Sequence, residues 1–160
     1  MADRLPTREG PRPRTTPTNP HMQLDQQPAD TTQRALLAAE VFALRGVIER
    51  ESAISVPGAR ALWLDRVPPD APRDAFMIGA ELAHLHPGTD QSLHAMLPPD
   101  LVADAIEAGW AEQHPVARRG LIPANAVMLY APRDDAERET VAALVRAAHA
   151  YATHSEGARR

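Results

Sequence analysis

Apolar residues recur at helical spacing near both ends of the chain, and shorter apolar runs lie between. The first helical stripe follows Asp30, with Gln33 three positions later as in a capping box. Asp134 and Glu137 repeat that arrangement before the last stripe, which predicts a second amphipathic helix. The apolar positions of the two stripes are Leu37, Val41, Leu44 and Ile48, then Val141, Leu144, Val145 and Ala148.

The central runs predict strands. Pro57-Gly58 is a strong turn signal and separates two short runs, so these are expected to form a hairpin. A third helix is expected between Asp100 and Gly109, where the glycine suits the position after a helix end. The expected strands are Ala53–Val56, Ala61–Leu64, Phe76–His86, Ser92–Leu97 and Ala126–Ala131.

This order of elements predicts an α+β fold, with a mostly antiparallel sheet of about five strands and three helices packed on one face. A single domain is expected over residues 30–154. Residues 1–29 hold six prolines, four arginines and few large apolar groups, so the composition predicts a disordered tail. Residues 155–160 are expected to be a disordered C-terminus.

Composition narrows the class of protein. The absence of cysteine excludes disulfides and thiolate chemistry. A net charge of −4 argues against a nucleic-acid surface, and no apolar run is long enough to span a bilayer. A cytoplasmic protein without membrane partners is therefore expected. All 17 basic residues are arginine, which together with the many Ala and Pro suggests a GC-rich bacterial genome.

Histidines concentrate in the predicted hairpin after residue 80. Because side chains alternate along a strand, His84 and His86 share one face, and Ser92, His94 and Met96 share one face of the next strand. A turn between the strands pairs His84 with His94, which brings three imidazoles and a hydroxyl together. The opposite face, formed by Ala and Leu, is expected to lie on the helices.

Three interpretations of this cluster remain open. A neutral histidine can act as general base, since its ordinary pKa lies near physiological pH. Alternatively, His84, His86 and His94 hold a divalent metal such as Zn²⁺ or Fe²⁺, with Glu81 or His114 completing the shell. The alternation places Glu81 on the other strand face, which counts against it as a ligand. In the third interpretation the histidines are structural.

Three further residues are candidates for contact with a small-molecule ligand. Trp110 and His114 follow the middle helix, where an indole near an imidazole can line a pocket, although a Trp here also suits a core anchor. Tyr130 lies on a predicted strand, from which its hydroxyl can reach the histidine face. Ser92, Met96, Trp110, His114 and Tyr130 are therefore the expected substrate-binding residues.

Several sequence words resemble the luciferase-domain family, which includes fungal luciferases and many bacterial proteins. The words are Ala83-His-Leu-His-Pro87, Asp90-Gln-Ser-Leu-His94, Leu97-Pro-Pro99, Gly109-Trp-Ala-Glu112 with His114-Pro115, and Tyr130-Ala-Pro-Arg-Asp134. The likeness covers most of residues 50–150. It implies an oxygenase that uses O₂ on an enolic or aromatic molecule without an added organic cofactor, with His84, His86 or His94 as base. The alternative is a non-catalytic domain that binds a small molecule or a metal at the same face.

Overall fold

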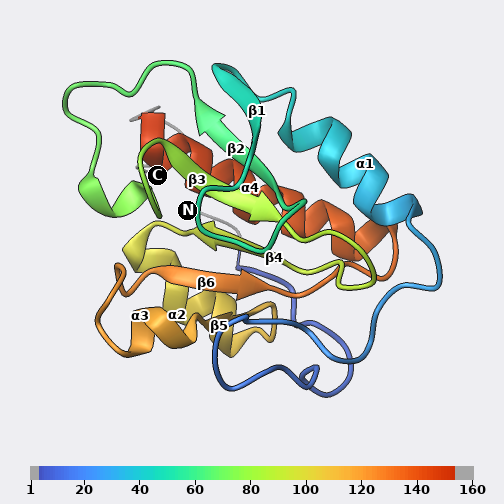
Figure 1. Ribbon diagram of the computed structural model, residues 1–160. Helices are drawn as coiled ribbons and strands as arrows, with labels where there is room; N and C mark the ends of the chain where they lie inside the picture. The colour runs from blue at the N-terminus through green and yellow to red at the C-terminus, as the bar shows by residue number, and fades with distance from the viewer. Residues whose placement is uncertain (1–3, 154–160) are drawn as a thin grey trace.

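A computed structural model describes residues 4–153. It contains one sheet with helices packed against it (Figure 1). The strands are β1 (Val47–Glu51), β2 (Arg60–Leu64), β3 (Glu81–Leu85), β4 (Leu93–Met96), β5 (Ala111–Gln113) and β6 (Ala126–Leu129). The helices are α1 (Thr32–Val41), α2 (Pro99–Glu107), α3 (Pro115–Arg118) and α4 (Asp135–Thr153), with a 3₁₀ turn at Arg73–Ala75. This confirms the predicted α+β class.

The sheet has six strands in the order β1-β2-β3-β4-β6-β5, and every neighbouring pair is antiparallel. The additional strand is β5, which lies in a segment that the sequence predicted to be loop. It pairs with β6 through Ala111 opposite Leu129. The number of strands predicted from the sequence was therefore one too few. The missing strand is the shortest of the sheet, too brief to show an alternating pattern.

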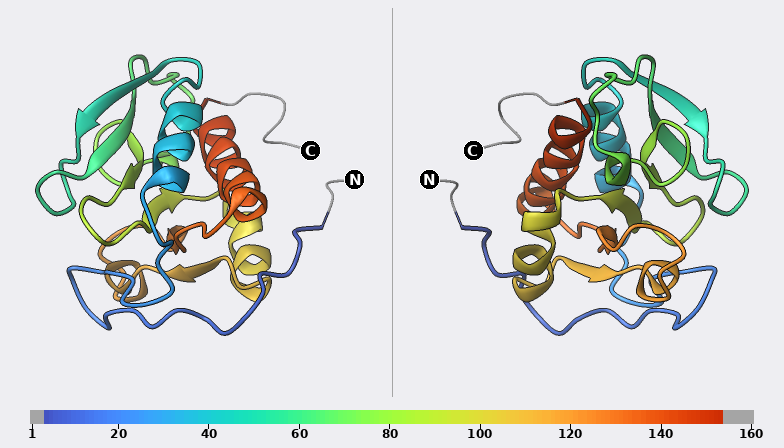
Figure 2. Two further views of the ribbon diagram at one scale, coloured as in Figure 1. Left: turned by 90° about the vertical axis from the view of Figure 1, so that its right-hand side faces the viewer. Right: turned by 90° about the vertical axis from the view of Figure 1, so that its left-hand side faces the viewer.

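One face of the sheet carries the main core. Leu93, Ala95 and Leu97 point to this face, as do Val127 and Leu129 of β6. Buried residues of α1, α2 and α4 pack on it, which agrees with the predicted three helices (Figure 2). The short helix α3 lies elsewhere, and its Ala117 joins a small cluster with Met77, Met96 and Ala126.

Three predicted elements begin or end elsewhere, and one of them is the strand predicted from Phe76, which begins at Glu81 as β3. Helix α1 ends at Val41, and Ile48 lies in β1 rather than in the helical stripe. Gly46, with a φ of +76°, turns the chain into β1 directly before Val47. The hairpin partner of β2 is β1, so Ala53–Val56 is the connecting loop. The Ser52 hydroxyl holds that loop by accepting from the amides of Ile54 and Ser55.

The N-terminal segment, residues 4–29, lies along the β5 edge of the sheet and not free in solvent as its composition predicts (Figure 2). Arg12 donates to the Ala111 carbonyl of β5, and the Gln23 side chain accepts from the Ala131 amide. Arg8 and His21 are buried. A few specific polar contacts, and not a large apolar area, hold the segment, so composition alone does not reveal it. The expectations for residues 1–3 and 155–160 fall outside the described residues.

Candidate functional site

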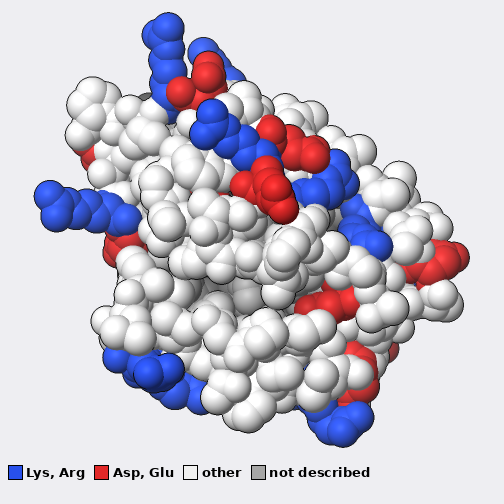
Figure 3. Space-filling model, in the orientation of Figure 1, with Lys and Arg blue, Asp and Glu red and all other residues white. Residues whose placement is uncertain are grey.

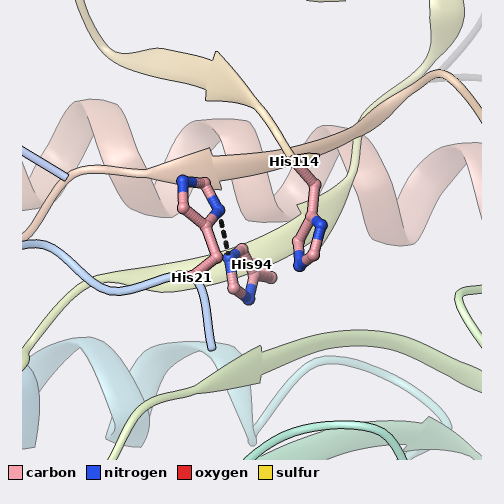
Figure 4. Close-up of side chains that lie close together, drawn as sticks. All are labelled: His21, His94 and His114. Carbon is pink, nitrogen blue, oxygen red and sulfur yellow. Dashed lines mark hydrogen bonds between the residues drawn. The ribbon is translucent and has the colours of Figure 1, made fainter. Parts of the chain in front are cut away.

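Five buried histidines meet on the sheet face opposite the main core. His84 and His94 lie on the paired strands β3 and β4, directly opposite each other as predicted. His86 follows β3, His114 follows β5, and His21 comes from the N-terminal segment. Figure 4 shows His21 and His114 approaching His94 from different segments of the chain. The cluster therefore joins residues that are far apart in sequence.

Ring nitrogens in this cluster approach to hydrogen-bond distance. His94 Nδ1 lies 2.9 Å from His84 Nε2 and 3.1 Å from His86 Nε2. Its other nitrogen, Nε2, lies 3.0 Å from His21 Nδ1 (Figure 4). His94 is thus the centre of the cluster, and its two ring nitrogens face different neighbours.

Glu81 holds the outer nitrogen of His84, with 2.8 Å between its Oε2 and His84 Nδ1. The sequence placed Glu81 on the opposite strand face, and this was wrong. Trp63 pairs with Glu81 while Leu62 pairs with Ala83, so one residue of β3 is extra. Such a bulge shifts the alternation by one position and turns Glu81 toward the histidine face.

Ser92 and Asp90 hold the outer nitrogen of His86. Nδ1 of His86 is 3.0 Å from Ser92 Oγ and 3.2 Å from Asp90 Oδ2. The Ser92 hydroxyl donates to Asp90 Oδ1 at 2.7 Å. Because that hydroxyl has only one proton to give, it accepts from the imidazole, and His86 carries its proton on Nδ1.

Glu112 performs the same role for His21, with 2.9 Å between Glu112 Oε2 and His21 Nε2. Its carboxylate also accepts from the hydroxyls of Thr15 and Tyr130. No pattern in the sequence indicated His21, which lies outside the histidine-rich hairpin, or this role of Glu112. Only the path of the N-terminal segment brings the two residues together.

His114 differs from the other histidines of the cluster. It precedes α3, and its Nδ1 accepts from the Val116 amide at 3.0 Å. A neutral His114 therefore carries its proton on Nε2. Burial, with the neighbouring His21, His84 and His86, lowers the pKa of His114 to about 4, so the ring is neutral at physiological pH.

The carboxylates of the site are ionised, and its central imidazole is neutral. Burial alone would raise the pKa of Glu81, but hydrogen bonds from His84, Ser52 and the Ala53 amide lower it below its ordinary value. Burial, followed by the surrounding histidines, lowers the pKa of His94 well below 6.5. The pKa of His84 is also lowered by burial. An ionised Glu81 therefore lies beside a neutral His84, and the central His94 is neutral as well.

Two overlapping groups of histidines have the arrangement of metal ligands. One consists of His84, His86 and His94, and the other of His21, His94 and His114. Within each group, one ring nitrogen per residue lies within 4.8 Å of the others. Three imidazoles are a common ligand set for divalent transition metals.

A pocket of about 330 Å³ opens beside the cluster. Its lining combines His84, His86, His94 and His114 with apolar side chains from two loops, from α3 and from the segment after it, including Ile54, Val56, Met77, Val116 and Ile122. Asn19–Met22 of the N-terminal segment closes one side. Figure 3 shows this face hollowed near its centre, with uncharged residues around the hollow. The pocket suits a small, largely apolar molecule with a few polar atoms.

The remaining candidate residues from the sequence lie away from this pocket. Trp110 belongs to the main core, and its Nε1 donates to the Pro6 carbonyl. Met96 is buried in the small cluster beneath α3. Tyr130 reaches Glu112 and not the histidine rings, and Ser92 reaches the pocket only through His86. Of the expected substrate-binding residues, His114 alone lines the pocket.

Comparisons with known proteins converge on one family. Residues 79–148 match the family described as "Luciferase domain". A luciferase of Armillaria mellea is 28% identical over 166 residues, which cover 94% of this chain and 62% of that protein. A luciferase of Neonothopanus nambi is 34% identical over 76 residues, covering 46% of this chain and 28% of that protein. No solved structure matches significantly.

These alignments also bear on the extent of the domain. The chain spans about 62% of the length of the Armillaria mellea protein. That alignment leaves only 6% of this chain outside, so it extends into the N-terminal segment that carries His21. Among residues 4–153, no helix is long and apolar enough to cross a membrane.

Proposed function

Because residues 79–148 match the luciferase-domain family, we propose that this protein binds an enolic or aromatic small molecule in the pocket and oxidises it with O₂. The observation that carries the proposal is the contact between an apolar pocket and a floor of neutral, buried imidazoles. A substrate hydroxyl at this floor meets nitrogen atoms that can receive its proton. The resulting enolate is electron-rich and can react with O₂ without an organic cofactor.

His114 supplies the matching donor. Its Nε2–H has no acceptor among residues 4–153, and the side chain lines the pocket. It is therefore available to a carbonyl or developing oxyanion of the substrate. The apolar lining from Ile54, Val56 and Met77 excludes water, which protects oxygenated intermediates from hydrolysis.

Oxygen uptake tests this proposal. The full chain should consume O₂ with hydroxylated pyrones or other enolic aromatics, and His114→Gln should lower the rate by about 100-fold, as for loss of an oxyanion donor. His149→Gln is the matched control, because His149 on α4 hydrogen-bonds to the Arg45 carbonyl and does not line the pocket. No uptake with any such substrate, despite a folded protein, would reject oxygenase activity.

A non-catalytic binding domain is the second candidate, and the lining of the pocket favours it as much as it favours catalysis. The two are separated by measuring binding and turnover on one compound. Saturable binding, weakened by His114→Gln but without O₂ consumption, would assign the pocket to ligand storage or transport. Cytoplasmic location and bacterial origin remain part of the proposal and rest on composition.

A further inference from the structure

The histidine cluster has fewer ring protons than its ring nitrogens have contacts of hydrogen-bond length. With one ring proton on each of His84, His86, His94 and His21, three of these protons lie toward Glu81, the Ser92–Asp90 pair and Glu112. The single proton of His94 must then serve three contacts: one with His21 and two at its own Nδ1. At least two contacts between nitrogen atoms are left with lone pair facing lone pair.

The most consistent arrangement places the His94 proton on Nε2. From there it is donated to His21 Nδ1, and His21 donates in turn to Glu112. Three lone pairs then converge, on His84 Nε2, His86 Nε2 and His94 Nδ1. Unpaired buried lone pairs at about 3 Å are unfavourable, and a cation between them removes the repulsion.

We propose that His84 Nε2, His86 Nε2 and His94 Nδ1 are the protein ligands of one divalent transition-metal ion. Metal–nitrogen bonds of about 2.0–2.1 Å and the observed nitrogen separations of 2.9 and 3.1 Å imply angles near 90–100° at the ion. Because both angles that include His94 are near 90–100°, a fourth ligand can approach the ion from the side of the pocket, which all three histidines line. Neutral imidazole suits Zn²⁺, Co²⁺ and Fe²⁺ better than it suits Ca²⁺ or Mg²⁺.

The outer shell supports the same three ligands. Each ligating ring has its second nitrogen held: His84 by Glu81, His86 by Ser92 and Asp90, and His94 by His21. Carboxylates in this position fix the tautomer and increase the basicity of the ligand. His21 extends this pattern, since it connects His94 to Glu112.

The same count of ring protons and lone pairs argues against a second ion between His21, His94 and His114. His114 offers an N–H and not a lone pair on Nε2, because its Nδ1 accepts from the Val116 amide. Nε2 of His94 is already occupied by the proton shared with His21. We therefore infer a stoichiometry of one, with His114 as a donor beside the ion.

This inference deepens the proposed function and rests on it for its role in the reaction. His84, His86 and His94 all line the pocket, so the open side of the ion faces the substrate. Once the ion is bound, these ring nitrogens are ligands and no longer act as the base. A substrate hydroxyl on the ion ionises more readily, and its proton leaves to water at the mouth of the pocket. The ion would thus produce the enolate that the proposed oxidation requires, and His114 would donate to a second oxygen of the substrate.

Metal titration of the full chain tests the site directly. Chelator-stripped protein should bind one equivalent of Zn²⁺ or Co²⁺, and the Co²⁺ form should show ligand-field bands of a nitrogen-coordinated site. His94→Gln and His84→Gln should each weaken binding by more than the 10- to 100-fold typical of outer-shell losses. His149→Gln should bind as the parent chain does. Zn²⁺ should raise the thermal midpoint of the parent but not of His94→Gln.

The outcomes separate this inference from the proposed function. No binding by the folded parent, or equal binding by His94→Gln, would overturn the metal site, and two equivalents would overturn the single-ion assignment. Oxygen uptake that survives complete metal removal would overturn the role of the ion while leaving the oxygenase proposal intact. Stoichiometric Zn²⁺ without turnover of any enolic compound would support the site and reject the oxygenase.

Discussion

Two buried carboxylates, Glu81 and Asp90, and the half-buried Glu112 determine what the histidines of this protein can do. Glu81, Asp90 and Glu112 all lie behind imidazole rings and not in front of them. Hydrogen bonds from those rings keep the carboxylates ionised despite burial, because they lower pKa values that burial alone would raise. The carboxylates in turn keep ring protons on the outer nitrogens, so lone pairs remain for the centre of the cluster.

Strand alternation was sufficient to predict part of this chemistry. It placed His84 opposite His94 and separated them from the apolar face, both of which the structure confirms. It was insufficient for Glu81, because a bulge has no distinctive residue type here, and for His21, which no local pattern connects to the hairpin. Contacts between distant segments carry no periodicity for a sequence pattern to detect.

Replacement of one outer-shell carboxylate should weaken metal binding without removing a ligand. In Glu81→Gln the amide still accepts from neighbouring donors but no longer provides the charge that fixes His84. The affinity for Zn²⁺ should fall by about 10- to 100-fold. Isothermal titration of Zn²⁺ into Glu81→Gln, and into the control Glu139→Gln, measures this loss of affinity. Glu139→Gln changes an exposed carboxylate on α4. Equal affinities would mean that Glu81 is only a structural residue.

Stability should fall as the solution is acidified from neutrality. The pKa of His114 is about 4 in the fold against 6.5 as its ordinary value, so the unfolded chain binds a proton in this window and the fold does not. The stabilisation is therefore complete above pH 6.5 and is lost as pH falls toward 4, by at most about 3 kcal/mol. The lowered pKa values of His84 and His94 act in the same direction.

Urea unfolding at pH 7 and at pH 4.5 measures this dependence. In His114→Gln the difference in unfolding free energy between the two pH values should be smaller than in the parent. A difference as large as that of the parent would mean that His114 is accessible to protons in the fold.

At the scale of elements, the turn into β3 affects both the stability of the fold and the position of the histidine cluster. Gly79 lies in this turn with φ of +54°, and an added Cβ would meet Trp63 Cη2 at 2.9 Å. The turn ends at Glu81, whose amide donates to the Ile78 carbonyl and whose side chain holds His84. The sequence predicted a continuous strand over 76–86, because apolar alternation continues through the turn.

Gly79→Ala should therefore affect both stability and the site. A left-handed backbone costs a non-glycine residue about 1–2 kcal/mol, and contact with Trp63 adds to this. Gly120→Ala is a matched control, since Gly120 has φ of +76° and open space around its Cβ position. Chemical denaturation should show the larger loss for Gly79→Ala, and only this variant should bind Zn²⁺ more weakly. Equal losses would mean that Trp63 simply moves aside.

At the scale of the molecule, the N-terminal segment completes the site. The fold class followed from the order of elements, whereas the place of residues 4–29 did not follow from composition. Prolines suggest disorder in a sequence, but they also reduce the entropy lost when a segment docks. Here the segment contributes His21 to the cluster and Asn19–Met22 to the pocket.

Hydrogen exchange on the full chain can test this docking. The amides of Thr16 and Leu24 donate to the carbonyls of Met22 and Arg14, which closes a short antiparallel loop. These two amides should exchange at least about tenfold more slowly than expected for a disordered peptide. His21→Gln should reduce that protection. Exchange at the disordered-peptide rate in the parent would instead support a free tail.

The most direct measurement on the central claim is anomalous diffraction from crystals soaked with Zn²⁺, collected on both sides of the metal absorption edge. The account predicts one peak at the foot of the pocket, about 2.0–2.1 Å from His84 Nε2, His86 Nε2 and His94 Nδ1. An absent peak, or one seated between His21 and His114, would contradict the assignment of protons and ligands on which the site depends.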